Sequence, residues 1–216
     1  MEDNKYNVFM KLLNFNPNKY TREKVFRDFI SMFAITLSNK VLFNEKNSKT
    51  YQKICDEYDK QEQCHFHALS YELTRLLYNE NEPYDVLGEL YKKVTNRSYL
   101  KLLNNTKLQK VGKKLQGIIS INPKTKNGKM IEISCGSGGM ILAYASTLKM
   151  FKLNYKTDLH VTAIDSDMLN IFMTYIQMYF FGIAATVMLV DERNCRELMT
   201  LYTPMYENIN VEAMVA

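Results

Sequence analysis

The chain lacks several features that would place it in well-defined classes of protein. Its 216 residues include only four cysteines, and their positions match no disulfide framework and no common zinc site. No apolar run approaches membrane-spanning length, and the polar start Met1–Lys5 does not resemble a signal peptide. There is also no Ser-His-Asp or Cys-His nucleophile pattern and no phosphate-binding Gly-Lys-Thr loop. We therefore expect a cytoplasmic protein with reduced thiols, no metal and no membrane contact.

Acidic residues are missing from one long stretch. From Tyr91 to Lys129 the chain has eleven lysines and arginines and no aspartate or glutamate, although the whole sequence contains 23 acidic residues. Such a stretch attracts phosphate backbones through counterion release, and Lys110, Lys113 and Lys114 are candidate contacts to nucleic acid. A solvated helix face followed by a linker would have the same composition. Both interpretations stay open.

Glycine is scarce, with eight residues in all, yet three of them fall within four positions. A short apolar run that starts at Met130 ends at Gly136, Gly138 and Gly139, and a helical pattern begins at once. In this order, strand, glycine turn and helix hold a nucleotide-like ligand against backbone N–H groups at the helix N-terminus. Glycine lets the backbone approach the ligand because it has no Cβ. The pattern predicts a ligand-binding loop, although short glycine motifs also recur by chance.

The order of residues at this corner narrows the ligand. Glu132-Ile-Ser-Cys-Gly-Ser-Gly-Gly139 resembles the S-adenosylmethionine loop of the N6-adenine DNA methyltransferases, in particular the modification subunits of restriction systems and phages. Ile133 stands where that family has proline. The segment Leu87–Tyr91 is similar to the helix that precedes the family's cofactor domain. The resemblance implies S-adenosylmethionine as cofactor and DNA as partner, with these cofactor-binding residues: Glu132, Ser134, Cys135, Gly136, Ser137 and Gly138.

Apolar spacing divides the chain into two regions. Residues 1–117 are predicted to be mainly helical, with the clearest pattern over Thr21–Leu37. Residues 118–216 alternate strand and helix, which favours parallel strands joined by right-handed crossovers. The predicted strands are Ile118–Ile121, Met130–Cys135, Leu159–Asp165 and Ala184–Val190. We therefore expect an α/β fold: a truncated, Rossmann-like methyltransferase sheet of three or four mainly parallel strands, preceded by a helical region.

So short a sheet would leave the cofactor strand with an exposed hydrogen-bonding edge. The strand Ile118–Ile121, the N-terminal helices or a second protein chain could cover this edge. The predicted helix over Leu169–Phe181 is apolar around much of its circumference, as a sandwiched or interfacial helix would be. We therefore expect a homo-oligomer or a complementary subunit.

Two carboxylates end predicted strands. Asp165, followed by Ser166, stands where an acidic side chain can accept the ribose hydroxyls of an adenosine cofactor, which is the interpretation we favour over a helix cap. Asp191 closes the third strand. The resemblance implies that it meets the adenine amine, and a cap on the following helix is an equal alternative.

The family's catalytic motif, Asp/Asn/Ser-Pro-Pro-Tyr/Phe, is absent from the sequence. Its nearest counterpart contains Thr203, Pro204 and Tyr206, with Met205 in place of the second proline. A simple turn is the alternative for this fragment. Two functions follow. One is a DNA adenine-N6 methyltransferase that relies on a partner for catalysis, and the other is an inactive cofactor-binding or structural accessory protein of a phage or mobile element.

Overall fold

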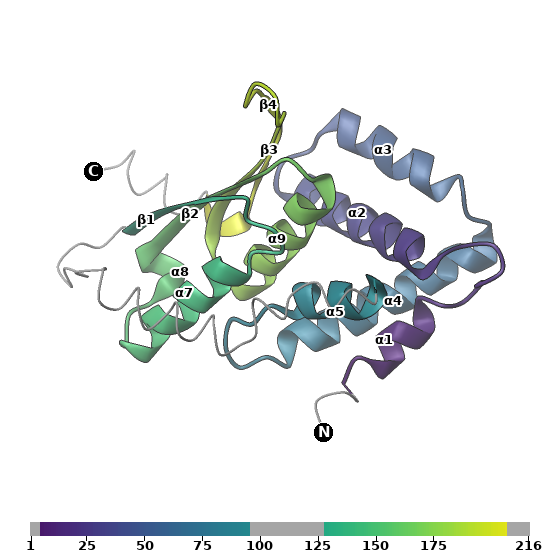
Figure 1. Ribbon diagram of the computed structural model, residues 1–216, viewed down its shortest axis with the longest axis horizontal. Coiled ribbons are helices and arrows are strands. Elements are labelled where there is room, and N and C mark those ends of the chain that lie inside the picture. The colour runs from purple at the N-terminus through teal and green to yellow at the C-terminus, as the bar shows by residue number, and fades with distance from the viewer. Residues whose placement is uncertain (1–4, 96–127, 207–216) are drawn as a thin grey trace.

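The structure, a computed structural model, describes residues 5–95 and 128–206 and consists of a helical region beside a small sheet (Figure 1). The helices of the first region are α1 (Asn7–Leu12), α2 (Arg22–Val41), α3 (Glu45–Cys55), α4 (Lys60–Tyr78) and α5 (Val86–Thr95). The second region contains β1 (Gly128–Ile133), α7 (Gly139–Met150), α8 (Tyr155–Asp158), β2 (Leu159–Asp165), α9 (Met168–Phe181), β3 (Ala184–Val190) and β4 (Glu197–Tyr202). The predicted strand Ile118–Ile121 and the predicted boundary at residue 117 lie outside the described residues.

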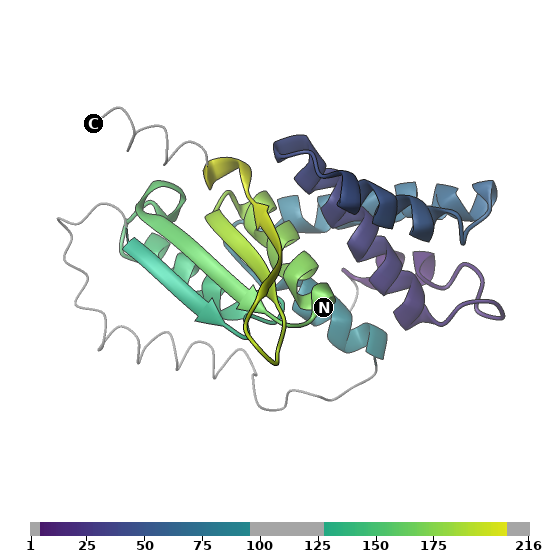
Figure 2. The same cartoon turned by 90° about the horizontal axis from the view of Figure 1, so that it is seen from above.

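The sheet has the strand order β1-β2-β3-β4, in which β1, β2 and β3 are parallel and β4 is antiparallel to β3. The helices α7 and α9 connect the parallel neighbours and lie on the same side of the sheet (Figures 1 and 2). Three parallel strands joined in this way form one half of a Rossmann-like sheet. The predicted α/β class and the mainly parallel sheet are therefore confirmed.

The strand β4 was not predicted. After β3 the chain turns back through a hairpin instead of entering a third crossover helix, and β4 pairs with β3 from Val190↔Glu197 to Thr186↔Tyr202. A register shift at Leu189 and Val190 marks the start of the hairpin.

The helix α9 lies at the centre of the molecule. Ten of its 14 residues are buried, among them Thr174 and Gln177. One side of α9 packs on β2 and β3, and α2, α4 and α5 pack against its other sides. The apolar circumference seen in the sequence is therefore that of a sandwiched helix, which joins the helical region to the sheet.

The outer strand β1 is only partly covered. Among the described strands β1 pairs with β2 alone, and the side chains of Ile131 and Ile133 are 68% and 73% exposed. Because the expected strand Ile118–Ile121 lies outside the described residues, what covers the edge of β1 stays a prediction. None of the described helices is long and apolar enough to cross a membrane.

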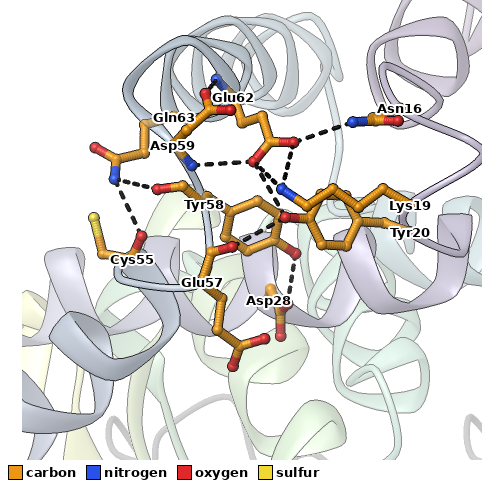
Figure 3. Close-up of polar contacts among 10 residues, drawn as sticks. All are labelled: Asn16, Lys19, Tyr20, Asp28, Cys55, Glu57, Tyr58, Asp59, Glu62 and Gln63. Atoms are coloured by element: carbon orange, nitrogen blue, oxygen red, sulfur yellow. Dashed lines mark hydrogen bonds and ion pairs between the residues drawn. The ribbon is translucent and has the colours of Figure 1, made fainter.

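A polar cluster fixes the loop before α2 against the start of α4 (Figure 3). The buried carboxylate of Glu62 accepts hydrogen bonds of 3.0–3.1 Å from the side chains of Asn16, Lys19 and Tyr20 and from the N–H of Asp59. Burial by itself would raise the pKa of Glu62, but these donors outweigh burial and lower the pKa to about 2. Because both oxygens are satisfied within the protein, we interpret the cluster as structural.

Candidate functional site

The glycine loop connects β1 to α7 through an unusual backbone path. Ser134, Gly136 and Gly138 have φ angles of 57°, 58° and 87°, so left-handed residues alternate along the loop. The N–H of Cys135 donates to the carbonyl of Ile164 at 3.1 Å, which fixes the loop to the end of β2. The loop therefore lies where the carboxyl ends of β1 and β2 meet, which is where open α/β sheets bind their ligands.

Among the residues that the structure describes, none accepts a hydrogen bond from the first turn of α7. Its N-cap is Gly138, which has no side chain to accept a hydrogen bond, and its first turn contains no acidic residue. Within the described part of the chain, no group accepts the backbone N–H of Met140 or Ile141. The helices α2, α4 and α9, in contrast, are capped by the side chains of Thr21, Asp59 and Asp167. A helix N-terminus with free donors is suited to an anionic group such as a carboxylate.

Two glycines of the loop have different surroundings. A Cβ at Gly136 would meet no atom within 4 Å, so the space beside this residue is open. A Cβ at Gly138 would lie 3.2 Å from the side chains of Thr174 and Met178. Gly138 therefore allows the loop to pack on α9, and Gly136 leaves its backbone accessible to a ligand.

Asp165 lies at the end of β2 and is 8% exposed. One of its carboxylate oxygens accepts the N–H of Gly136 at 2.9 Å and the side-chain amide of Asn170 at 3.2 Å, and the other accepts the N–H of Asp167 at 2.9 Å. This carboxylate organises the loop and retains little capacity for a ribose. It is also not the cap of α9, because Asp167 accepts the N–H of Leu169 in that role.

Other polar residues lie at the same end of the sheet as Asp165. Ser166 and Asp167 follow Asp165 directly and are both exposed. On the neighbouring strand, Asp191 accepts the N–H of Arg193 at 2.8 Å and so begins the hairpin between β3 and β4. The alternative that Asp191 caps a following helix is wrong, since a strand follows it. Asp191 lies at the same end of the sheet as the glycine loop.

Two further residues of the loop motif have distinct chemistry. Glu132 is half-buried on β1, and burial raises the pKa of its carboxyl above the usual value. Cys135 is buried, and burial raises the pKa of its thiol to about 12, so the thiol is neutral. The hydroxyl of Thr174 lies 3.5 Å from this sulfur and donates to the carbonyl of Gly136 at 2.8 Å. Cys135 therefore packs in the core below the loop and does not act as a nucleophile.

The structure does not bring the candidate catalytic segment to the loop. Because β4 is antiparallel, Thr203 and Pro204 lie at the opposite end of the sheet, about 20 Å away for strands of this length. The hydroxyl of Thr203 is fully buried, accepts the N–H of Ala185 at 2.8 Å and donates to the carbonyl of Ile183 at 2.8 Å. The ring of Tyr206 packs against other aromatic rings nearby. Within one chain, these residues cannot act on a ligand at the glycine loop.

Sequence reasoning missed two side chains that hold the loop in place. The hydroxyl of Ser137 donates to the carboxylate of Asp85 at 2.8 Å. The side-chain amide of Gln177 donates to the carbonyl of Ser137 at 2.7 Å and to Asp85 at 2.9 Å. One signal was present: Asp85 stands three residues before Gly88, the spacing of a helix N-cap, and two residues before the segment Leu87–Tyr91 that resembles the family.

Two expectations concern charge and metals. Lys110, Lys113 and Lys114 lie outside the described residues, so their contact with nucleic acid stays a prediction. Among the residues that the structure describes, no group of three or more His, Cys, Asp or Glu side chains could hold a metal ion.

Comparison with known proteins gives little beyond this geometry. No protein-family model matches the chain, and no curated protein matches it. Among solved structures, the chain is similar to a protein from Listeria monocytogenes that is provisionally described as a class I S-adenosylmethionine-dependent methyltransferase. The two sequences are 12% identical, the TM-score is 0.45, and the match covers 97% of this chain and 70% of that one.

Proposed function

We propose that the protein binds S-adenosylmethionine at the glycine loop and takes part in methyl transfer to the N6 amine of adenine in DNA. The observation that carries the proposal is the free N-terminus of α7 beside the open backbone of Gly136, at the carboxyl end of β1. The resemblance of residues 132–139 to the loop of the adenine-N6 enzymes supports this choice of cofactor and acceptor.

The residues at this end of the sheet suit the parts of the cofactor. The N–H groups of Met140 and Ile141 can bind the carboxylate of its methionine moiety. The half-buried carboxylate of Glu132 can bind the ammonium group, since a nearby positive charge would favour its ionised form. S-adenosylmethionine supplies a methyl group on a positively charged sulfur, which a nitrogen lone pair can displace.

The adenosine moiety would extend toward β2 and β3. Because three N–H donors already occupy Asp165, we assign the ribose hydroxyls to Ser166 and Asp167 together with the remaining acceptor capacity of Asp165. Asp191, at the end of β3, is the candidate acceptor for the adenine amine.

The second candidate function is a cofactor-binding accessory protein without activity of its own. It is favoured by the position of Thr203 and Tyr206 at the far end of the sheet, since this nearest counterpart of the family's catalytic motif cannot reach the loop within one chain. Methyl transfer to duplex DNA, measured with and without a candidate partner subunit, separates the two functions. Activity of the chain alone would exclude the accessory role.

DNA and a second subunit are the partners that we propose. The basic stretch from Tyr91 to Lys129 supports DNA, and the exposed side chains of Ile131 and Ile133 on an edge strand support a subunit contact. Salt-dependent binding to duplex DNA and the mass in solution would test them separately.

Calorimetric titration with S-adenosylmethionine and S-adenosylhomocysteine tests cofactor binding. Gly136→Ala is the informative variant, because its Cβ would fill the open space beside the loop. Gly182→Ala is the matched control: Gly182 has a φ of 68° at the end of α9, and the atoms nearest to a Cβ there belong to the flexible side chain of Lys156, at 3.4 Å or more. Both variants place alanine in a left-handed conformation at a cost of about 1–2 kcal/mol.

We expect micromolar binding by the wild type, on the order of −8 kcal/mol. Gly136→Ala should weaken binding at least about tenfold, and Gly182→Ala should retain it despite a similar loss of stability. Equal losses in both variants would mean that strain alone explains the effect. Absence of binding by the wild type at millimolar ligand would refute the proposed function.

A further inference from the structure

Asp85 connects two parts of the molecule that are distant in sequence. It directly precedes α5, and one of its carboxylate oxygens accepts the N–H of Gly88 at 2.9 Å, the hydrogen bond of a helix N-cap. The same oxygen accepts the side-chain amide of Gln177 from α9. The other oxygen accepts the hydroxyl of Ser137 in the glycine loop at 2.8 Å. One carboxylate thus joins α5, α9 and the loop.

The carboxylate of Asp85 is packed so closely that the two glycines beside it could not carry a side chain. A Cβ at Gly88 would lie 2.2–2.7 Å from the carboxylate atoms of Asp85. A Cβ at Gly139, the first residue of α7, would lie 2.8 Å from its nearer oxygen. Two glycines from separate elements therefore make room for a single side chain, so the packing here is built around Asp85.

The contacts also set the direction of the loop. Gln177 binds the carbonyl of Ser137 and Asp85 binds its hydroxyl, so both polar groups of Ser137 point toward the protein. The N–H groups of Met140 and Ile141 follow at the start of α7, and no described residue accepts them. Ser137 is fixed on one side by Asp85, and Gly136 on the other by Asp165.

We propose that Asp85 is a positioning residue for the cofactor loop: it holds Ser137 so that the N-terminus of α7 is preorganised for the ligand. The helical region is then part of the binding site although it does not touch the ligand. The expected effect of Asp85 on ligand binding rests on the proposed function, whereas its expected effect on the order of the loop rests on the structure alone.

Asp85→Ala tests the proposal, with Asp59→Ala as the matched control. Asp59 is also an N-cap in the helical region and accepts the N–H of Glu62 at 2.8 Å, but it belongs to the cluster at the start of α4. Loss of either cap should lower the stability of the protein, seen as a lower melting temperature. Only Asp85→Ala also frees Ser137, and it should weaken binding of S-adenosylhomocysteine about tenfold to a hundredfold. Asp59→Ala should leave affinity within about twofold.

Asp85→Asn separates geometry from charge. The amide oxygen can keep both bonds made by one carboxylate oxygen, and the NH2 group can donate to the hydroxyl of Ser137, which can rotate to accept. We expect this variant to restore most of the affinity that Asp85→Ala loses. Rescue would show that position matters, and failure of a folded Asp85→Asn protein to bind would overturn the positioning role.

Hydrogen exchange of residues 136–141 in the ligand-free protein provides a readout that does not depend on the cofactor. Faster exchange of this segment in Asp85→Ala, and not in Asp59→Ala, is the expected result. Unchanged exchange in Asp85→Ala would overturn the inference. Absence of wild-type binding together with faster exchange would refute the proposed function and leave the role of Asp85 in the loop established.

Discussion

Replacing Asp165 with asparagine distinguishes a carboxylate that organises the loop from one that serves only a ribose. One oxygen of Asp165 accepts two donors, from Gly136 and Asn170, and the other accepts the N–H of Asp167. An asparagine must place its NH2 group at one of these two positions. In either orientation, at least one backbone N–H faces another donor and loses its acceptor.

The magnitude follows from the burial of this site. Asp165 is 8% exposed, so water cannot readily replace the lost acceptor, and a buried unsatisfied donor costs about 1–3 kcal/mol. For a chain of this size, each kcal/mol lowers the melting temperature by about 2–4 °C. A cost of about 2 kcal/mol therefore predicts a Tm about 4–8 °C below that of the wild type.

Thermal unfolding without ligand, followed by circular dichroism, measures this difference. Asp191→Asn is the control, since within the described chain its carboxylate accepts one hydrogen bond, from the N–H of Arg193, and an amide oxygen can make the same bond. We expect this control to change Tm by about 2 °C or less. If the Tm of Asp165→Asn is also within about 2 °C of the wild-type value, Asp165 does not organise the loop and would serve only as a ribose contact.

Two other predictions concern stability away from the loop. Thr203→Val should lower the free energy of unfolding by about 1–3 kcal/mol, because the buried N–H of Ala185 loses its acceptor. Denaturant unfolding measures this loss. Cofactor affinity should stay unchanged, and weaker cofactor binding by the folded variant would contradict the structural role of Thr203. Because the folded-state pKa of Glu62 is lowered to about 2 from a usual value of 4.5, its contribution is complete above about pH 4.5 and is lost as pH falls toward about 2. Between about pH 4.5 and pH 2, urea unfolding should show a smaller decrease in the free energy of unfolding for Glu62→Gln than for the wild type. An equal decrease in the two proteins would contradict the stabilising role of the cluster in Figure 3.

The strands of the parallel sheet were predicted well because their signals are local. The bounds of β2 and β3 agree with the predicted strands, and β1 starts and ends two residues earlier than expected. A short apolar run bounded by a turn or a helix start is sufficient to recognise a buried parallel strand. The helical pattern over Thr21–Leu37 is likewise confirmed, since α2 spans Arg22–Val41 and the side chain of Thr21 caps it.

The strand β4 was missed because its hairpin carries no short-range signal. The connection from Asp191 to Arg196 is longer than a two-residue turn and contains no Asn-Gly or Asp-Gly pair. An Asp at the end of a parallel strand normally suggests that a helix follows. Pairing of β4 with β3 depends on the side chains of the whole sheet. At the end of the sheet opposite the hairpin, the hydroxyl of Thr203 accepts the N–H of Ala185 and so adds to this pairing.

The candidate site was predicted in part, because a local sequence signal gives its position, whereas the contacts that support it join residues far apart in the sequence. The glycine loop and Asp165 occupy the expected end of the sheet, but two of the three donors to Asp165 are backbone N–H groups that no residue pattern encodes. The contacts from Ser137 to Asp85 and from Gln177 to Asp85 span 52 and 92 positions in the sequence. Such contacts exist only after α5 and α9 pack together, so one sequence cannot reveal them.

The same contacts argue that stability and ligand binding are linked in this protein. The loop is held by Asp165 of the sheet, by Thr174 and Gln177 of α9, and by Asp85 at the start of α5. Because α9 is packed between the sheet and the helical region, a change in that packing displaces two of these supports together. A ligand that binds only the ordered loop must then stabilise the helical region as well as the sheet. Protection from hydrogen exchange on ligand binding should therefore extend into α5 and α9.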